Sequence, residues 1–192
     1  MAKLYFYYAS MNAGKSSTLL QTAFNYGERG MRVSLWTAAL DNRPGFGAIS
    51  SRIGLASDAH RYETDTDIET RVLADHAADP IACVLVDEAQ FLTRDQVWQL
   101  ARLADDAGIP VLCYGLRTDF QGELFTGSAS LLGIADALVE LKAVCDCGRK
   151  ATMNLRVDAQ GTAVREGAQT EIGGNDRYVA MCRRHFCEAL AG

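Results

Sequence analysis

An eight-residue segment near the N-terminus has the composition of a phosphate-binding loop. Residues 9–16 read ASMNAGKS and lie between an apolar run and a helix-prone stretch. A helix N-terminus leaves its first amide groups unpaired and carries partial positive charge, so it attracts phosphate. Lys15 is expected to reach the β- and γ-phosphates of a nucleotide, and Ser16 to bind Mg²⁺. Ala9 replaces the usual first glycine of the motif, but Gly14, Lys15 and Ser16 are intact.

Two adjacent carboxylates, Asp87 and Glu88, follow the apolar run of residues 82–86. A continuous apolar run of this kind is typical of a strand buried on both faces of a parallel sheet. In phosphate-loop proteins, a carboxylate at the end of such a strand holds Mg²⁺. The AGKS string alone could be an ordinary glycine turn before a helix. The loop and the acidic strand end together favour a nucleotide-binding site.

A second candidate site consists of cysteine and histidine residues near the C-terminus. Cys145 and Cys147 form one close pair, and Cys182 is followed by His185 after two residues. Two such pairs can close a tetrahedral zinc site, which would stabilise a segment too small to bury much core of its own. Cys187 is the rival fourth ligand, but two intervening residues let Cys182 and His185 converge from one tight turn. The alternative to a metal site is a group of unrelated thiols.

Alternating strand and helix patterns must position these residues. The apolar runs predict strands at residues 4–8, 31–37, 82–86, 110–116 and 137–144. Helices are predicted from residue 17 to a stop near Gly30, at 65–78, and at 93–107, where Thr93 and Gln96 can form a capping box. Residues 41–60 show no clear period, so we expect a long functional loop there. This rhythm predicts an α/β fold with a parallel sheet, flanking helices, and ligands at the carboxyl ends of the strands.

The character of the chain changes at Cys145, after which it is polar and rich in glycine. Residues 152–157 and 162–166 flank the turn-like sequence DAQG, which predicts a hairpin. We therefore expect two domains. Residues 1–144 would form a phosphate-loop α/β domain that binds a nucleotide, and residues 145–192 a small zinc-stabilised β-ribbon domain.

Composition limits the classes of protein that fit. The chain has 192 residues, 48% of them hydrophobic, which is enough for one sizeable core and a small appendage. Its net charge of −5 gives no general electrostatic case for nucleic-acid binding. No apolar stretch approaches the length of a membrane span, and the N-terminus lacks a signal-peptide pattern. We therefore expect a cytoplasmic protein with no membrane or nucleic-acid partner, whose six cysteines ligate metal or lie buried.

Six motifs occur in one order along the chain. They are the phosphate loop at 9–16, VLVDEAQF at 84–91, YGLRTDFQGELF at 114–125, CDC at 145–147, IGGNDRY at 172–178 and CRRH at 182–185. This arrangement resembles the thymidine kinase family, in the bacterial type that is similar to the human cytosolic enzyme. The resemblance covers nearly the whole chain, and DEAQF combined with the zinc pairs is its specific part. It implies a RecA-like phosphate-loop sheet with a zinc-binding lasso domain.

The resemblance also implies a reaction. ATP would transfer its γ-phosphate to the 5′-hydroxyl of thymidine, and of deoxyuridine, giving dTMP and ADP in pyrimidine salvage. It further implies Mg²⁺ with ATP, a structural Zn²⁺, feedback inhibition by dTTP and a homotetramer. Lys15 would hold the phosphates and Arg43 would lie near the reacting ones. Glu88 would accept the proton of the attacking hydroxyl, while Asp87 would hold Mg²⁺ through water. A second metal carboxylate or a solvated strand-end residue is the alternative for Glu88, and a solvated loop charge for Arg43.

The positions that match the family fall into two binding sets. The ATP and Mg²⁺ set comprises Ala9, Ser10, Met11, Asn12, Ala13, Gly14, Lys15, Ser16, Asp87, Glu88, Ala89 and Gln90. The nucleoside set comprises Met11, Leu116, Phe120, Thr170, Glu171, Ile172, Gly173 and Tyr178. Aromatic faces suit a pyrimidine ring, and backbone groups at 170–173 would read most of the base. Taken singly, Met11 and Leu116 are more typical of a plain core.

Two other classes of protein share parts of this pattern. An ATP-hydrolysing nucleic-acid motor could use Glu88 to activate water, but the chain is short and acidic and lacks an aromatic and basic strip for single strands. A nucleotide-binding regulator would not need Lys15, Asp87 and Glu88 together. Nucleoside-dependent release of ADP would indicate the kinase, and ATP turnover without nucleoside would indicate the motor.

Overall fold

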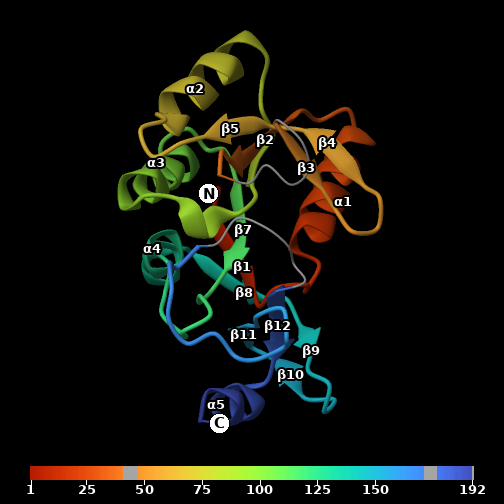
Figure 1. Ribbon diagram of the computed structural model, residues 1–192. Coiled ribbons are helices and arrows are strands. Elements are labelled where there is room, and N and C mark those ends of the chain that lie inside the picture. The colour runs from red at the N-terminus through yellow and green to blue at the C-terminus, as the bar shows by residue number, and fades with distance from the viewer. Residues whose placement is uncertain (41–46, 171–176, 192) are drawn as a thin grey trace.

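Among the residues that the structure describes, six short strands form one parallel sheet at the centre of the fold (Figure 1). The computed structural model describes residues 1–40, 47–170 and 177–191. Across the sheet the strand order is β5-β2-β6-β7-β1-β8, and every pairing is parallel. The strands are β1 (Leu4–Ala9), β2 (Val33–Ala38), β5 (His60–Tyr62), β6 (Cys83–Val86), β7 (Val111–Leu116) and β8 (Ala137–Glu140). The predicted α/β fold is therefore confirmed.

The register of the sheet brings the ends of its central strands together. Ala9, the last residue of β1, pairs with Leu116, the last residue of β7. Val86 at the end of β6 pairs with Cys113 of β7 and with Trp36 of β2. Segments that leave the carboxyl ends of parallel strands meet at one edge of the sheet. The phosphate loop after β1 and the acidic pair after β6 therefore emerge at the same edge, with β7 between the two strands.

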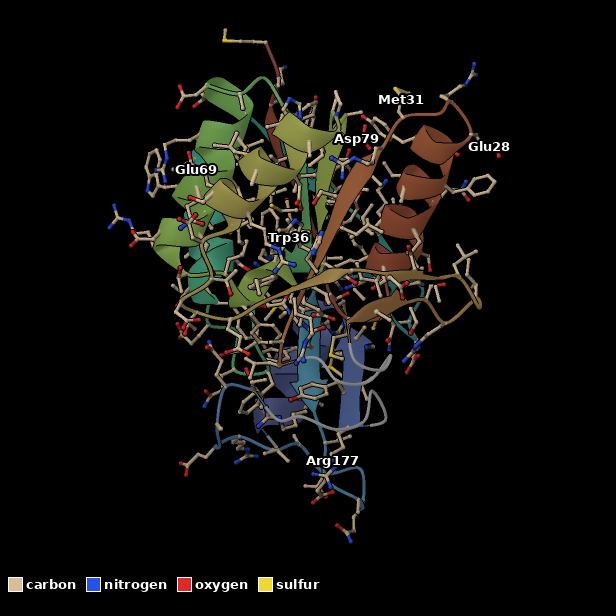
Figure 2. All side chains as sticks on the ribbon, turned by 90° about the horizontal axis from the view of Figure 1, so that it is seen from above. Glu28, Met31, Trp36, Glu69, Asp79 and Arg177 are labelled. Atoms are coloured by element: carbon tan, nitrogen blue, oxygen red, sulfur yellow. The ribbon has the colours of Figure 1, made fainter. Side chains whose placement is uncertain are left out.

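Helices cover both faces of the sheet. They are α1 (Lys15–Gly27) on one face and α2 (Ile68–Ala78), α3 (Arg94–Asp105) and α4 (Thr126–Ile134) on the other. Successive strand residues point to opposite faces. Accordingly, Val84 and Val86 pack in the core beneath α2, α3 and α4, whereas Cys83 and Leu85 pack beneath α1. Figure 2 shows this layering, with α1 and α3 on opposite sides of the strands and Trp36 between them.

Side-chain caps fix the starts of two helices. The capping box predicted for α3 is present. The backbone N–H of Gln96 donates to the Thr93 hydroxyl, and the backbone N–H of Thr93 donates to the side-chain oxygen of Gln96. Helix α2 starts after Asp67, whose carboxylate accepts from the Thr70 N–H at 3.0 Å. Within the described ranges, no helix has the length and apolar character needed to cross a lipid bilayer.

The segment predicted as a long loop contains short strands. Of residues 41–60, those from 41 to 46 lie outside the described residues. The rest forms the hairpin of β3 (Ala48–Ser50) and β4 (Ala56–Asp58), and β5 begins at His60. Three-residue strands are too short to show a period of two. The helices α4 and α5 (Arg183–Ala191) were not predicted either.

Two antiparallel pairs form the small β-ribbon at one end of the molecule. One pair joins β9 (Ala143–Val144) to β10 (Lys150–Ala151), and the other joins β11 (Met153–Arg156) to β12 (Tyr178–Met181). The predicted hairpin of 152–157 with 162–166 is confirmed only beside its turn, because the ladder partner of β11 is β12. The turn at Asp158 forms, and an isolated bridge joins Val157 to Ala163, but the described residues 162–166 do not extend it into a strand. The strand predicted at 137–144 also divides, since β8 ends at Glu140.

Candidate active site and metal site

The phosphate loop leaves β1 at Ala9 and turns into α1 through two residues with left-handed backbone. Asn12 has φ 63° and Gly14, at the N-cap, has φ 79°. Asparagine and glycine tolerate this conformation better than other residues. The Lys15 ammonium group donates to the carbonyl of Ser10 at 2.9 Å, so its side chain folds back across the loop. The first amide groups of α1 thus lie beside a cation, which is an arrangement that favours phosphate.

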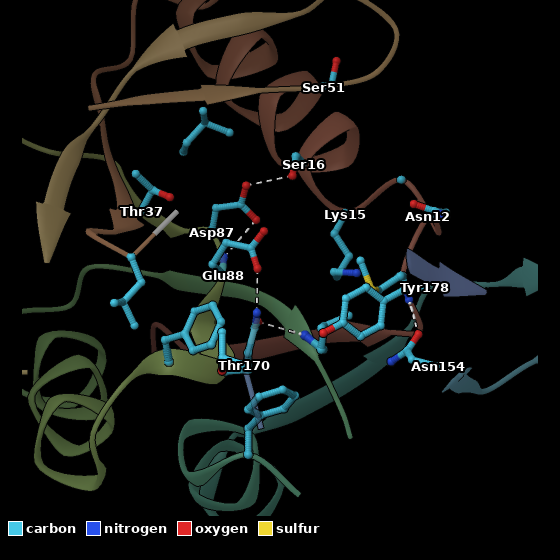
Figure 3. A pocket seen from close by; sticks show the side chains of 18 of the residues that line it. Asn12, Lys15, Ser16, Thr37, Ser51, Asp87, Glu88, Asn154, Thr170 and Tyr178 are labelled. Carbon is cyan, nitrogen blue, oxygen red and sulfur yellow. Dashed lines mark hydrogen bonds between the residues drawn. The ribbon is translucent and has the colours of Figure 1, made fainter. Parts of the chain in front are cut away.

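The acidic pair begins where β6 ends. The Ser16 hydroxyl donates to one oxygen of Asp87 at 2.8 Å, and the Glu88 N–H donates to the other at 3.0 Å (Figure 3). Asp87 is 4% exposed. Burial raises the pKa of its carboxyl group to about 7; the charge of Glu88 adds to this effect, and the hydrogen bond from Ser16 opposes it. A cation beside Ser16 and Asp87 would stabilise the ionised carboxylate.

Glu88 has a backbone conformation that is rare outside glycine. Its φ is 52°, in the left-handed region. Such residues cost on the order of 1–3 kcal/mol and persist when their surroundings hold them. The buried Tyr62 hydroxyl donates to the carbonyl of Glu88 at 2.8 Å, and the Gln90 amide donates to its carboxylate at 2.5 Å. The strand end therefore presents Glu88 in one fixed arrangement.

A cavity of about 530 Å³ collects most of the predicted site residues. The predicted residues that line it are Met11, Asn12, Gly14, Lys15, Ser16, Asp87, Glu88, Gln90, Leu116, Phe120, Thr170 and Tyr178. The cavity lining does not include Ala9, Ser10, Ala13 or Ala89. Arg43, Glu171, Ile172 and Gly173 lie outside the described residues. The cavity therefore joins a polar, phosphate-loop end to an end walled by aromatic side chains.

Asn154 lines this cavity and was missed by the sequence analysis. It lies on β11, is 2% exposed, and accepts a hydrogen bond from the Met11 N–H at 2.6 Å. Its amide nitrogen donates to the carbonyl of Thr118 at 3.1 Å. A buried amide with both ends bonded specifies one position for its strand. Its sequence signal was weak, because Asn154 is one of several polar residues that alternate with apolar ones along residues 152–157.

Arg156, two residues further along β11, holds the aromatic wall together. Its guanidinium lies 3.8 Å from the centre of the Phe120 ring and 5.2 Å from that of Tyr178. It also donates to the Tyr178 hydroxyl at 2.9 Å and to the carbonyl of Ala168 at 2.9 Å. Arginine favours such stacked positions because its guanidinium group is planar and weakly hydrated. This contact links the cavity wall to the segment that leads to Thr170.

The four predicted zinc ligands come together in the β-ribbon. The ligand atoms of Cys145, Cys147, Cys182 and His185 all lie within 4.8 Å of one another, so this Cys3His group could bind zinc. The backbone N–H groups of Cys147 and Cys182 lower the pKa of the Cys145 thiol to about 6, and thiolate is the form that binds metal. Cys187 is exposed on α5 and does not belong to this group.

Comparison with known proteins agrees with the motifs. Residues 2–186 match the family model described as thymidine kinase. A thymidine kinase of Novosphingobium aromaticivorans is 76% identical over 190 residues, which cover 99% of both chains. Those of Zymomonas mobilis and Vibrio parahaemolyticus are 60% and 59% identical over 190 residues, covering 99% of this chain and 98% and 99% of theirs.

The likeness to one solved helicase structure is much weaker. The Pif1 helicase from Candida albicans superposes with a TM-score of 0.42 at 14% identity, over 74% of this chain and 36% of the helicase. A superposition this partial carries no functional argument. The family match and the relatives, in contrast, extend over almost the whole length of the sequence. The chain therefore belongs to the thymidine kinase family.

Proposed function

We propose that this protein transfers the γ-phosphate of ATP to the 5′-hydroxyl of thymidine, giving dTMP and ADP. The observation that carries the proposal is the single cavity in which a phosphate loop, an acidic pair and an aromatic wall meet, in a chain of the thymidine kinase family. Phosphoryl transfer depends mainly on positioning and on stabilisation of charge. An enzyme that catalyses it on a nucleoside needs both binding sites within one enclosure.

ATP would occupy the end of the cavity formed by the phosphate loop. Lys15, which now donates to the Ser10 carbonyl, would turn to the β- and γ-phosphates. Ser16 and Asp87 fit a magnesium ion, because they offer two hard oxygen ligands 2.8 Å apart at a strand end. The raised pKa of Asp87 supports this assignment, since a nearby cation would favour its ionised form. When bound, the ion would neutralise charge on the phosphates.

Glu88 would act as the base. Glu88 lines the cavity that the phosphate loop and the aromatic wall share, and there the hydroxyl of a bound nucleoside would approach the γ-phosphate. A positioned carboxylate can accept the hydroxyl proton as the new bond forms. The fixed backbone of Glu88 supports this role, because strained residues that are held in place cluster at functional sites.

Thymidine would occupy the aromatic end. Phe120 and Tyr178 offer ring surface for the base, and Met11 and Leu116 complete the apolar lining. Backbone groups from 170 to 173 would read the base edges, as the family resemblance implies. That resemblance also supports a place for Arg43 beside the reacting phosphates.

The zinc site and several wider properties are part of the same proposal. The Cys3His group would hold one structural Zn²⁺ in a lasso domain of residues 145–192, after an ATP-binding domain of residues 1–144 whose last two residues, β9, pair with β10 of the lasso domain. The resemblance further supports phosphorylation of deoxyuridine, feedback inhibition by dTTP, a homotetramer and a cytoplasmic location. We propose that the protein has no nucleic-acid partner and no membrane partner.

A transfer assay with labelled ATP and a panel of nucleosides tests the proposed reaction. The wild-type protein should label thymidine at its 5′ position and release ADP in equal amount. The Glu88→Gln variant should bind both substrates but turn over about 10²- to 10⁴-fold more slowly, which is the usual contribution of general-base catalysis. Rapid ATP hydrolysis that is independent of nucleoside would contradict the proposal and favour a nucleic-acid motor.

A further inference from the structure

The side chain of Gln90 makes two hydrogen bonds, one to the carboxylate of Glu88 and one to the backbone of Leu116. It belongs to the one-turn 3₁₀ helix η1 (Ala89–Phe91) and is 2% exposed. Its side-chain nitrogen donates to Oε2 of Glu88 at 2.5 Å, a bond drawn at Glu88 in Figure 3. Its side-chain oxygen accepts from the backbone N–H of Leu116 at 3.0 Å. The side chain thus connects Glu88 to the end of strand β7.

The second of these bonds fixes the orientation of the first. A backbone N–H can only donate, so the atom of Gln90 that faces Leu116 must be its oxygen. The amide NH₂ group must then face Glu88. A flipped amide would place its oxygen against a carboxylate and its NH₂ group against another donor. The structure therefore offers the Glu88 carboxylate a donor that cannot turn away.

Two glycines let neighbouring backbone pack directly against this turn. A Cβ atom on Gly115, in β7, would lie 2.9 Å from the Gln90 nitrogen and 3.0 Å from its side-chain oxygen. A Cβ atom on Gly127, in α4, would lie 2.4 Å from the carbonyl oxygen of Ala89 and 2.9 Å from that of Gln90. Real Cβ atoms do not approach backbone this closely. Both the backbone and the side chain of Gln90 are therefore held.

We propose that Gln90 is a positioning residue that aims the Glu88 carboxylate at the nucleoside hydroxyl, rather than a contact to ATP. The inference rests on the proposed function of Glu88 as the base. The Tyr62 hydroxyl fixes the main chain of Glu88 and Gln90 fixes its side chain, so each acts on a different part of the residue. A reacting group misplaced by about 1 Å can lose about 100-fold in rate.

A double-mutant cycle on kcat tests this role. Gln90→Met keeps the length of the side chain but removes both hydrogen bonds. In the wild-type background it should lower kcat by about 10- to 100-fold and leave the KM values for ATP and thymidine within about threefold. In the Glu88→Gln background it should change kcat by less than about threefold, because no base remains to be aimed. Gly115→Ala, which crowds Gln90, should repeat this pattern and replaces Gln90→Met if that variant does not fold.

Gln96→Met is the matched control. Gln96 is also a buried glutamine with several hydrogen bonds, but it caps α3 and does not line the cavity. Its substitution should lower the melting temperature and leave kcat unchanged. Equal losses from Gln90→Met in the two backgrounds, or a rise in KM with kcat unchanged, would overturn the positioning role. Absence of thymidine phosphorylation by the wild type would instead overturn the proposed function, so the two failures are distinguishable.

Discussion

Replacing His185 by alanine should remove the metal from the β-ribbon, whereas replacing Cys187 by serine should not. In a tetrahedral zinc site, bonds of about 2.3 Å to sulfur and about 2.0 Å to nitrogen place neighbouring sulfurs about 3.8 Å apart and sulfur and nitrogen about 3.5 Å apart. The structure has Cys147 and Cys182 sulfurs 3.8 Å apart, and 3.3 Å between the Cys145 sulfur and Nδ1 of His185. Small side-chain shifts would therefore complete the site.

The metal should dominate the stability of this part of the chain. The buried cluster around the Cys3His group consists of Cys145, Ala151 and Cys182, so two of its three members are themselves ligands. Leu155 and Phe186 are the other buried apolar residues described in this part of the chain. Burial of an alanine methyl group contributes about 0.8 kcal/mol, whereas structural zinc in small peptides contributes about 10–16 kcal/mol. Without the ion, β9 to β12 should open locally while the parallel sheet stays folded.

Zinc analysis after gel filtration measures the first expectation, and hydrogen exchange measures the second. The wild type and Cys187→Ser should carry about one zinc per chain, and Cys182→Ser and His185→Ala much less. In the two depleted variants, the amides of β10 to β12 should exchange faster and those of β6 and β7 should not. Zinc lost from Cys187→Ser but kept by His185→Ala would refute the ligand assignment. A wild type that holds no zinc when purified without chelator would refute the site.

Three further predictions concern other parts of the chain. Thymidine, more than ATP, should protect the amides of 167–178 from hydrogen exchange, because that backbone would contact the base; protection by ATP alone would indicate a phosphate lid. Gly127→Ala should destabilise the fold by about 1–3 kcal/mol in denaturant titration, whereas Gly133→Ala in the same helix, with open space around it, should not. Asp67→Ala should lower the melting temperature at pH 7. This difference should shrink below about pH 4, because the Thr70 N–H lowers the pKa of Asp67 and the stability from its cap is lost as the pH falls through that value.

Signals that are local in the sequence predicted the corresponding parts of the structure. The phosphate loop could be recognised because its function requires particular residues at fixed spacing before a helix. The capping box of α3 could be recognised because Thr93 and Gln96 are three residues apart and its two hydrogen bonds join only these two residues. Asp87 and Glu88 could be placed at the cavity because they follow a buried parallel strand, and ligands of such sheets bind at the carboxyl ends of the strands.

Contacts between distant segments could not be predicted in this way. Strand β11 pairs with β12 across more than twenty residues, and nothing in its own sequence distinguishes that partner from the nearer segment 162–166. The hydrogen bond that the Leu116 N–H donates to Gln90 likewise depends on how β6 and β7 lie beside each other. The sequence around Gln90 identifies it only as one residue of the motif VLVDEAQF at 84–91. The packing of β6 against β7 turns the Gln90 side chain toward Glu88, and residue spacing in the sequence does not predict this orientation.

The one departure of the phosphate loop from its usual pattern has a structural counterpart in the β-ribbon. Where the motif usually begins with glycine, this chain has Ala9, buried and paired at the end of β1. The next two residues are held from outside the loop, since the Ser10 hydroxyl donates to the carbonyl of Ala151 at 3.3 Å and the Met11 N–H donates to Asn154. The first turn of the loop is thus fixed by hydrogen bonds to the ribbon. Because two of the three buried residues in the ribbon's cluster belong to the Cys3His group, loss of metal there should loosen β10 and β11, and with them the bonds that hold the phosphate loop.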